Sequence, residues 1–371
     1  MHILKCLTTI RLCEELAKDG INAIPICWVN ADSPPAFSNG SVSLMDADGE
    51  IHSMEISHSE TIPVHFSDLI SQVRKFGGGD FDNGVLGILE SAFLPGHSFS
   101  SASARLISAM MEPWGMIVCD PGAPEFRPIV SETVAQLQTR NLQFLMRDTA
   151  ATLAGLGYGP FPETGIPASL IQSSLFPAVA RVVDPLEICS LANVLPVFEE
   201  IGLVQPVIWP EGSATVGDAR SRRTLSRYNL NLVQLYSGEE EVLRGLRESS
   251  PRAAAGKLRS IKSEVETRIL QLKSLMPEES DFSERADSCK EKILYQIGRL
   301  EHLVDASLNA KERTASLHIH QVCNLLAPNG RLQERELAAI QIPLRYTIEG
   351  LRRLYEKLDI LNFEHQLIWM D

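Results

Sequence analysis

The sequence predicts a doubly wound α/β core that carries an antiparallel α-helical coiled-coil arm. Through the first 250 residues, short continuously apolar runs alternate with helical segments, as parallel strands do when helices connect them. Beyond that point apolar residues recur at spacings of three and four, which is typical of a coiled coil. We therefore divide the chain into a core with a connecting region at 1–250, an arm at 251–327 and a C-terminal helical return to the core at 328–371.

The core elements follow from apolar spacing and turn residues. An apolar stripe through Leu4, Leu7, Leu12 and Leu16 predicts a first helix that ends at Asp19-Gly20. Each later element is either a bounded apolar run or a capped periodic segment. They are strand 23–29, hairpin 42–44 and 51–56, a helix capped by Ser98 or Ser100, strand 116–119, helix 129–156, strand 178–183, helix 187–201 and strand 206–209.

The arm is predicted from two charged, periodic segments. One segment carries Leu258, Ile261, Val265, Arg268, Leu272 and Leu275, and the other carries Ile293, Ile297, Leu300, Val304 and Leu308. Pro277 separates them, so two antiparallel helices are expected. Two ordinary helices packed on the core are the alternative, and the length and charge of the segments favour the arm. A last helical segment is expected after 328–330, ending at Trp369.

Composition excludes several classes of protein. The 371 residues carry a formal net charge of −13, with 44% hydrophobic and 22% charged residues. These fractions exclude a collagen-like or disordered chain. The acidic balance argues against a nucleic-acid partner, which would require clustered Lys and Arg, although a small anionic ligand remains open.

The sequence also predicts where the protein works. The longest apolar stretch, 178–198, is interrupted by three charged residues, so no membrane-spanning helix is expected. The first residues lack the apolar region of a signal peptide. Seven cysteines without a Cys-x-x-Cys pair predict reduced thiols in a cytoplasmic protein.

Common catalytic and metal motifs are absent from the sequence. Gly77-Gly78-Gly79 is not followed by the Gly-Lys-Ser/Thr of a phosphate loop, and no Gly-x-Ser-x-Gly occurs. His318 and His320, near Cys323, are two residues apart and would point in different directions on a helix. No metal site is therefore expected.

Three polar segments are candidates for a site. Asp32 follows the first predicted strand, where open α/β sheets bind ligands, and Glu187 follows a later strand. The third segment contains Asn329, Gly330, Gln333 and Arg335. Each candidate also has a purely structural explanation. Asp32 and Glu187 could cap helices, where the helix dipole favours acidic residues, and the third segment could be the solvated start of a helix.

The chain resembles the bacillithiol-biosynthesis cysteine-adding enzymes, the cysteine ligases called BshC, through motifs that keep their order over nearly its whole length. They are Lys5-x-x-Thr8-Thr9-Ile10-Arg11-Leu12-x-Glu14-Glu15-Leu16, Ile24-Pro25-Ile26-Cys27-Trp28, Leu94-Pro95-Gly96-His97-Ser98-Phe99, 114–121, Asp184-Pro185-Leu186-Glu187-Ile188, Leu326-Ala327-Pro328, Leu332-Gln333-Glu334-Arg335 and His365-Gln366.

The resemblance implies a Rossmann-like core, a connecting region and a coiled-coil arm used for homodimerisation. It implies a reaction that joins cysteine to glucosaminyl malate through an amide. Activation of the carboxylate would require a nucleotide, ATP or ADP, bound near Asn329, Gly330, Gln333 and Arg335. Asp32 and Glu187 would be the catalytic residues.

The sequence departs from the family pattern at three positions and at its start. Pro34 and Pro35 stand where the family carries His and Asp, and Glu211 stands where it carries Arg. The family also has a Gly-rich segment before the first helix, so the chain is expected to be N-terminally shortened. Two hypotheses result: a cysteine ligase, or a catalytically degenerate paralogue that keeps the fold and the dimer.

Overall fold

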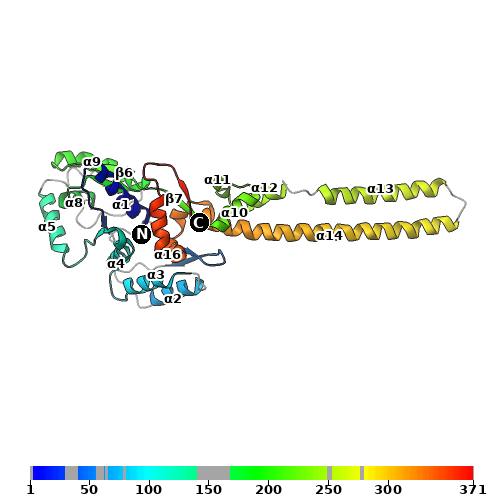
Figure 1. Cartoon of the computed structure of the whole chain (residues 1–371), viewed down its shortest axis with the longest axis horizontal. Coiled ribbons are helices and arrows are strands. Elements are labelled where there is room, and N and C mark those ends of the chain that lie inside the picture. Colours follow the sequence, from blue (N-terminus) through cyan, green and yellow to red (C-terminus); the bar gives the residue numbers. More distant parts are fainter. Residues whose placement is uncertain are drawn as a thin grey trace. The chain divides into compact units, whose positions relative to one another are not determined.

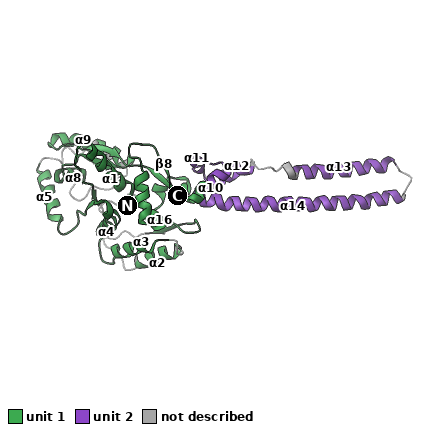
Figure 2. Ribbon diagram, in the orientation of Figure 1, with its two compact units in different colours: residues 1–222, 324–371 green, residues 223–323 purple. Residues whose placement is uncertain are grey.

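The computed structural model divides the chain into two compact units (Figure 2). Unit 1 contains residues 1–222 and 324–371, and unit 2 contains residues 223–323. The structure describes residues 3–29, 41–55, 62, 66–77, 81–139, 168–248, 253–275 and 280–370. Helices and strands alternate in unit 1, whereas unit 2 is helical in the residues that the structure describes (Figure 1).

Unit 1 holds all the strands that the structure describes. In order, its elements are α1 (Ile3–Lys18), β1 (Ile26–Trp28), β2 (Ser41–Met45), β3 (Ile51–Glu55), α2 (Phe66–Phe76), α3 (Asn83–Ala92), α4 (Phe99–Met111), a 3-10 turn (Glu112–Trp114), β4 (Ile117–Cys119), α5 (Arg127–Gln138), α8 (Ala168–Leu175), β5 (Ala180–Val183), α9 (Pro185–Glu200), β6 (Val207–Pro210), β7 (Ala214–Gly217), a 3-10 turn (Pro328–Gly330), α15 (Gln333–Glu336), α16 (Gln341–Lys357) and β8 (Gln366–Trp369). The helix α10 (Ala219–Tyr228) begins in unit 1 and ends in unit 2.

The strands pair two by two. β1 pairs with β4, β5 with β6 and β7 with β8, all in parallel, while β2 and β3 form an antiparallel hairpin. The mixed helix and strand composition is confirmed, and the predicted strands 116–119 and 206–209 lie in parallel pairs. In the described ranges each sheet has two strands, so one doubly wound sheet stays a prediction.

The helix α1 is central to the core of unit 1. Its apolar face, including Leu4, Leu7 and Ile10, is buried in the largest hydrophobic cluster. Gly20, with φ of 79°, follows the helix in the left-handed conformation that glycine adopts most easily. Thr8 is fully buried and accepts a 2.9 Å hydrogen bond from the backbone N–H of Gly212, which joins α1 to the connection between β6 and β7.

Two predicted elements require correction. The last segment is not a helix to Trp369: α16 ends at Lys357, and residues 366–369 form β8, which is paired with the buried strand β7. The predicted helix 129–156 begins as α5 and ends at Gln138, and residues 140–167 lie outside the described part of the chain.

Unit 2 contains the two long helices of the predicted arm. Its elements are α11 (Leu232–Leu235), α12 (Glu239–Glu248), α13 (Ala253–Leu275) and α14 (Ser280–Leu326), of which α14 ends in unit 1. The helix α13 ends at Leu275 and α14 begins at Ser280, and Pro277, predicted to separate them, lies outside the residues that the structure describes. Lys273, near the end of α13, forms a 2.6 Å ion pair with Asp287, near the start of α14.

Candidate functional site

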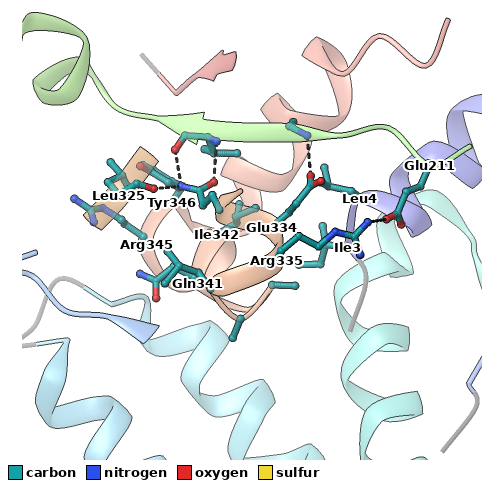
Figure 3. Close-up of a pocket in the computed structure, with 16 residues that line it drawn as sticks. Ile3, Leu4, Glu211, Leu325, Glu334, Arg335, Gln341, Ile342, Arg345 and Tyr346 are labelled. Atoms are coloured by element: carbon teal, nitrogen blue, oxygen red, sulfur yellow. Dashed lines mark hydrogen bonds and ion pairs between the residues drawn. The ribbon is translucent and has the colours of Figure 1, made fainter. Parts of the chain in front are cut away.

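Charged residues gather where the parallel strands β5 and β6 end. Asp184 directly follows β5, and Glu211 directly follows β6. Because the strands are parallel, their carboxyl ends lie at one edge, which is where ligands bind in open α/β sheets. Arg335 of α15 contacts both residues, with Nη2 3.4 Å from Glu211 Oε1 and Nη1 3.9 Å from Asp184 Oδ2. Figure 3 shows the contact between Arg335 and Glu211.

Glu187 lies in the same network and also caps α9. Its backbone N–H donates to Asp184 Oδ1 at 3.0 Å, and its carboxylate accepts a 3.1 Å hydrogen bond from the backbone N–H of Asp184. This reciprocal pair has the geometry of a capping box. The Glu187 carboxylate also forms an ion pair with Lys5 of α1. The helix-capping alternative therefore describes what Glu187 does locally, and a catalytic role stays a prediction.

Burial makes Glu211 the most perturbed carboxylate of this network. Its side chain is only 8% exposed, and burial raises its pKa from 4.5 to about 7. The positive charges of Lys5 and Arg335 act in the opposite direction, while Asp184 and Glu334 raise the pKa further. Glu211 is thus a buried carboxylate whose pKa lies near neutral pH.

Gln333 is committed to the backbone of the protein. Its Oε1 accepts a 2.8 Å hydrogen bond from the N–H of Val216, and its Nε2 donates to the carbonyls of Val216 and Leu325 at 3.0 and 2.7 Å (Figure 3). The residue is buried. Its neighbour Glu334 likewise accepts a 2.9 Å hydrogen bond from the N–H of Ala214. These contacts dock α15 against β7.

Replacing Gln333 by alanine is expected to lower the free energy of unfolding of unit 1 by about 2–3 kcal/mol, because a buried N–H and two carbonyls lose their partner. Asn329→Ala, in the same predicted ligand-binding set, is the matched control, since Asn329 is exposed and its amide donates to the side chain of Glu336 rather than to buried backbone groups. All four tryptophans lie in unit 1, so tryptophan fluorescence in urea reports its unfolding. Equal midpoints for the two variants would contradict the docking role.

The other predicted site residues that the structure describes lie in two different places. Asn329 and Gly330 form the turn before α15, both with positive φ, and the Asn329 amide donates to Glu336 at 2.6 Å. Arg335 belongs to the network with Glu187. Asp32 lies outside the residues that the structure describes, as do Pro34 and Pro35. The structure thus brings Glu187 and Arg335 together through Asp184.

A small cavity borders this network. Its volume is about 50 Å³, and its lining includes Glu211, Arg335, Arg345 and Tyr346 together with apolar residues of α1, α16 and β7 (Figure 3). Sites for drug-sized ligands are about 300–1,000 Å³ in volume. The cavity therefore has room for a few water molecules rather than for a nucleotide.

The residues predicted for ATP or ADP do not fit that ligand in this conformation. The amide of Gln333 is used by the backbone, and the guanidinium of Arg335 faces Asp184 and Glu211. Three carboxylates (Asp184, Glu187 and Glu211) belong to the network around Arg335, whereas phosphates are held by cations and backbone N–H groups. We therefore assign neither Gln333 nor Arg335 to a nucleotide, and a nucleotide near Asn329 and Gly330 stays a prediction.

Sequence reasoning did not single out Lys5 as a site residue, or the cluster formed by Ser213, Thr215 and His365. Ser213 Oγ donates to Glu334 Oε1 at 2.7 Å and lies 2.6 Å from His365 Nδ1, while Thr215 Oγ1 lies 2.9 Å from His365 Nε2. Burial lowers the pKa of His365. The signal for Lys5 and His365 was their presence in the motifs that the chain shares with its relatives.

Metal-binding and membrane-spanning features are not found in the part of the chain that the structure describes. Within those ranges, His, Cys, Asp and Glu side chains do not gather in threes as metal ligands would. His318 instead contacts Tyr228, and His320 contacts Glu239 at 2.8 Å. The helices described there are either too short or too polar to cross a bilayer.

Comparison with known proteins relates both parts of the chain to one family. A family model described as "Bacillithiol biosynthesis BshC, C-terminal coiled-coil domain" matches residues 214–370. Proteins named "Putative cysteine ligase BshC" from Solibacter usitatus and Koribacter versatilis are each 21% identical, and one from Geobacillus kaustophilus is 22% identical. These alignments cover 99% of this chain and 80–81% of the relatives. The chain is therefore similar to the BshC proteins over nearly its whole length, and residues 214–370 match the model of their C-terminal coiled-coil domain.

Proposed function

We propose that this protein joins cysteine to glucosaminyl malate through an amide, as the cysteine-adding enzyme of bacillithiol biosynthesis. The names of the relatives that align with 99% of this chain support the proposal. The observation on which it rests is the charged network at the carboxyl ends of β5 and β6. Amide formation requires an amine that has lost its proton, so a carboxylate held at this edge suits the reaction. Glu187, oriented by Lys5 and Asp184, is the proposed catalytic residue of the described part of the chain, with Asp32 as its partner.

ATP is the proposed co-substrate, because a free carboxylate must be activated before an amine can displace its oxygen. The chain itself would supply binding, orientation and proton transfer. The proposed reaction is a cytoplasmic one that uses reduced thiols, and the six cysteines whose side chains the structure describes are free.

The test is mass spectrometry of the purified full chain incubated with cysteine, glucosaminyl malate and ATP. Appearance of the amide-linked thiol, dependent on both substrates, would support the ligase. Parallel reactions without ATP, and with ADP in its place, test the nucleotide requirement separately. No product from protein shown to be folded by its tryptophan fluorescence would contradict the ligase.

A catalytically degenerate paralogue is the second candidate, and a specific observation favours it. Arg335 is neutralised by Glu211, the residue that stands where the family carries Arg, and by Asp184. The cationic group nearest the strand ends is therefore paired within the protein rather than directed at an anionic substrate. A folded dimer that forms no product would support this candidate.

We also propose that α13 and α14 form an antiparallel coiled-coil arm through which two copies of the chain pair. Within unit 2, Ile297 of α14 is buried, while Val304 and Leu308 are partly buried. Ile261 of α13 and Leu300 of α14 remain 46% and 52% exposed. The apolar repeat thus supplies both an inner contact face and an outer apolar face. An exposed apolar face on a charged helix is what a partner helix would cover.

Replacing Leu300 by aspartate is expected to convert a dimer into a monomer, because the variant would place a charge in the helix-helix interface. Leu300 is exposed in the single chain, so the folding of unit 2 should be retained. Light scattering after size-exclusion chromatography measures the mass. Asn309→Asp, which adds the same charge at an exposed position on the opposite face of α14, is the control and should stay dimeric. A wild-type monomer at micromolar concentration would contradict the proposal.

A further inference from the structure

An open groove of about 500 Å³ runs beside the C-terminal strand β8. It is lined by Arg222 of α10, Lys357 at the end of α16, Asn362 and the four residues of β8, all of which belong to unit 1. None of these residues lines the small cavity beside Glu211 and Arg335. The volume lies in the range of about 300–1,000 Å³ that is usual for small-molecule sites. The groove is therefore large enough for a ligand that the cavity could not hold.

The charged residues that line the groove are both cations. The whole chain has a net charge of −13, yet Arg222 and Lys357 line the groove without an acidic residue. The ammonium of Lys357 donates to the backbone carbonyl of Trp369 at 2.5 Å, and because an ammonium has three N–H donors, two are left for a ligand. Asp359, two residues beyond Lys357, accepts a 3.0 Å hydrogen bond from the backbone N–H of Leu361 and does not line the groove. The groove thus favours a negatively charged ligand.

Trp369 holds the guanidinium of Arg222 at the groove. The indole ring packs against Gly217 of β7, where a Cβ atom would lie only 2.4 Å from a ring carbon, so only a glycine leaves room for it. The guanidinium of Arg222 lies over the ring, 5.8 Å from its centroid, as in a cation–π contact. A cation that is already positioned loses less conformational entropy when it binds an anion.

The wall opposite the cations is braced by hydrogen bonds. The side chain of Gln366 accepts from the backbone N–H of Asp359 at 3.0 Å and donates to the carbonyl of the same residue at 2.8 Å. Asn362 accepts a 3.0 Å hydrogen bond from the backbone N–H of Glu364 through its side-chain oxygen. Its amide N–H groups can therefore serve as neutral donors beside the two cations.

We propose that this groove binds a small molecule that carries a dianionic group, either a phosphate or a pair of carboxylates. Two positive charges match a dianion, and the guanidinium and ammonium both form charge-assisted hydrogen bonds with its oxygens. The indole of Trp369 supplies an apolar surface for the remainder of the ligand. The proposal is independent of amide formation, because it concerns binding at residues that the reaction does not use.

The experiment titrates the full chain with inorganic phosphate and, separately, with malate, and follows tryptophan fluorescence at pH 7.5. Sodium chloride at matched ionic strength is the control for general screening of charge. We expect a saturable change with at least one of the two dianions. A response to phosphate alone indicates a phosphorylated ligand, and a response to malate alone indicates a dicarboxylate. No saturable response to either below about 10 mM, or an equal response to chloride, would overturn the proposal.

Variants assign the response to the groove. Arg222→Gln and Lys357→Gln should each weaken binding by about tenfold, because each removes one charge-assisted contact. Both side chains are exposed, so the fold should be retained. Lys75→Gln, which makes the same change in charge at an exposed position of α2, is the matched control and should bind like wild type. Trp369→Phe should abolish the fluorescence response. Equal weakening by all three charge variants, or a response that persists in Trp369→Phe, would contradict binding in the groove.

Discussion

Replacing Glu187 by glutamine is expected to lower kcat/KM for amide formation by about 100-fold or more, which corresponds to about 2.7 kcal/mol of lost transition-state stabilisation. Glutamine preserves the size of the side chain and still accepts the hydrogen bond from the backbone of Asp184, since Gln and Glu both serve in a capping box. What it loses is the negative charge opposite Lys5 and the ability to take up a proton. The substitution therefore separates catalysis from helix capping.

Initial rates of product formation measured by mass spectrometry, with cysteine and glucosaminyl malate varied in turn, provide the comparison. Glu199→Gln makes the same chemical change at an exposed position of α9 and should keep the wild-type rate. The free energy of unfolding should change by less than about 1 kcal/mol in both variants. If Glu187→Gln retained turnover within about threefold of wild type, Glu187 would be a capping residue only.

Local patterns predicted the elements that depend on local apolar runs. The run 23–29 contains β1, and the run 206–209 closely matches β6, because buried parallel strands are continuously apolar. The strands β7 and β8 were missed for the opposite reason. β7 is the short segment Ala214–Gly217, whose small residues resemble a loop, and β8 is defined only by its pairing with β7. Neither strand can be recognised before its distant partner is known.

The arm shows a similar limit. The spacing of three and four predicted both helices, but it placed Ile261, Ile297 and Leu300 alike in the apolar repeat. In the structure Ile297 is buried whereas Ile261 and Leu300 are exposed. A repeat of apolar residues predicts which faces of a helix are apolar. It does not predict which of two neighbouring apolar stripes contacts the other helix of the same chain.

The candidate site was predictable only in part. Asp184 and Glu187 are a local pair, so their spacing already indicated a helix start. Arg335 reaches them from a segment far along the chain, and Gln333 binds backbone groups that no side-chain pattern records. The raised pKa of Glu211 likewise arises from burial between distant elements. Sequence could name these residues but not what they contact.

Replacing Arg335 by methionine is expected to lower the free energy of unfolding of unit 1 by about 2–4 kcal/mol at pH 8. The side chain of Glu211 is 8% exposed, so its charge would be left buried without its cation. Methionine keeps much of the side-chain volume, which limits the loss from packing. Urea unfolding followed by tryptophan fluorescence measures the change. The matched control is Arg331→Met, where the guanidinium is exposed and its contact with Glu336 spans 3.5 Å.

The loss in free energy of unfolding caused by Arg335→Met should become smaller as the pH falls, because Glu211 takes up a proton. Its pKa is raised on folding, from 4.5 to about 7, so protonated Glu211 stabilises the fold below pH 4.5, and this contribution is lost as pH rises to about 7. The shift corresponds to about 3 kcal/mol across that window. At pH 5 Glu211 is mostly protonated with or without Arg335, which leaves only the contact with Asp184 to be lost. Equal destabilisation by Arg335→Met at pH 5 and pH 8 would therefore contradict a buried Glu211 charge.

A double variant identifies which carboxylate, Glu211 or Asp184, is responsible for the destabilisation by Arg335→Met. Glu211→Gln removes the buried charge in place, so adding it to Arg335→Met should recover most of the stability lost at pH 8, and the difference from wild type should no longer grow above pH 5. If the double variant were instead as unstable as Arg335→Met, Asp184 would be the acid that requires the guanidinium, because it is the other carboxylate within reach of Arg335. Recovery would mean that Arg335 compensates the buried charge of Glu211. The same residue pair then explains both the local stability of this edge and why its cation is not directed at a substrate.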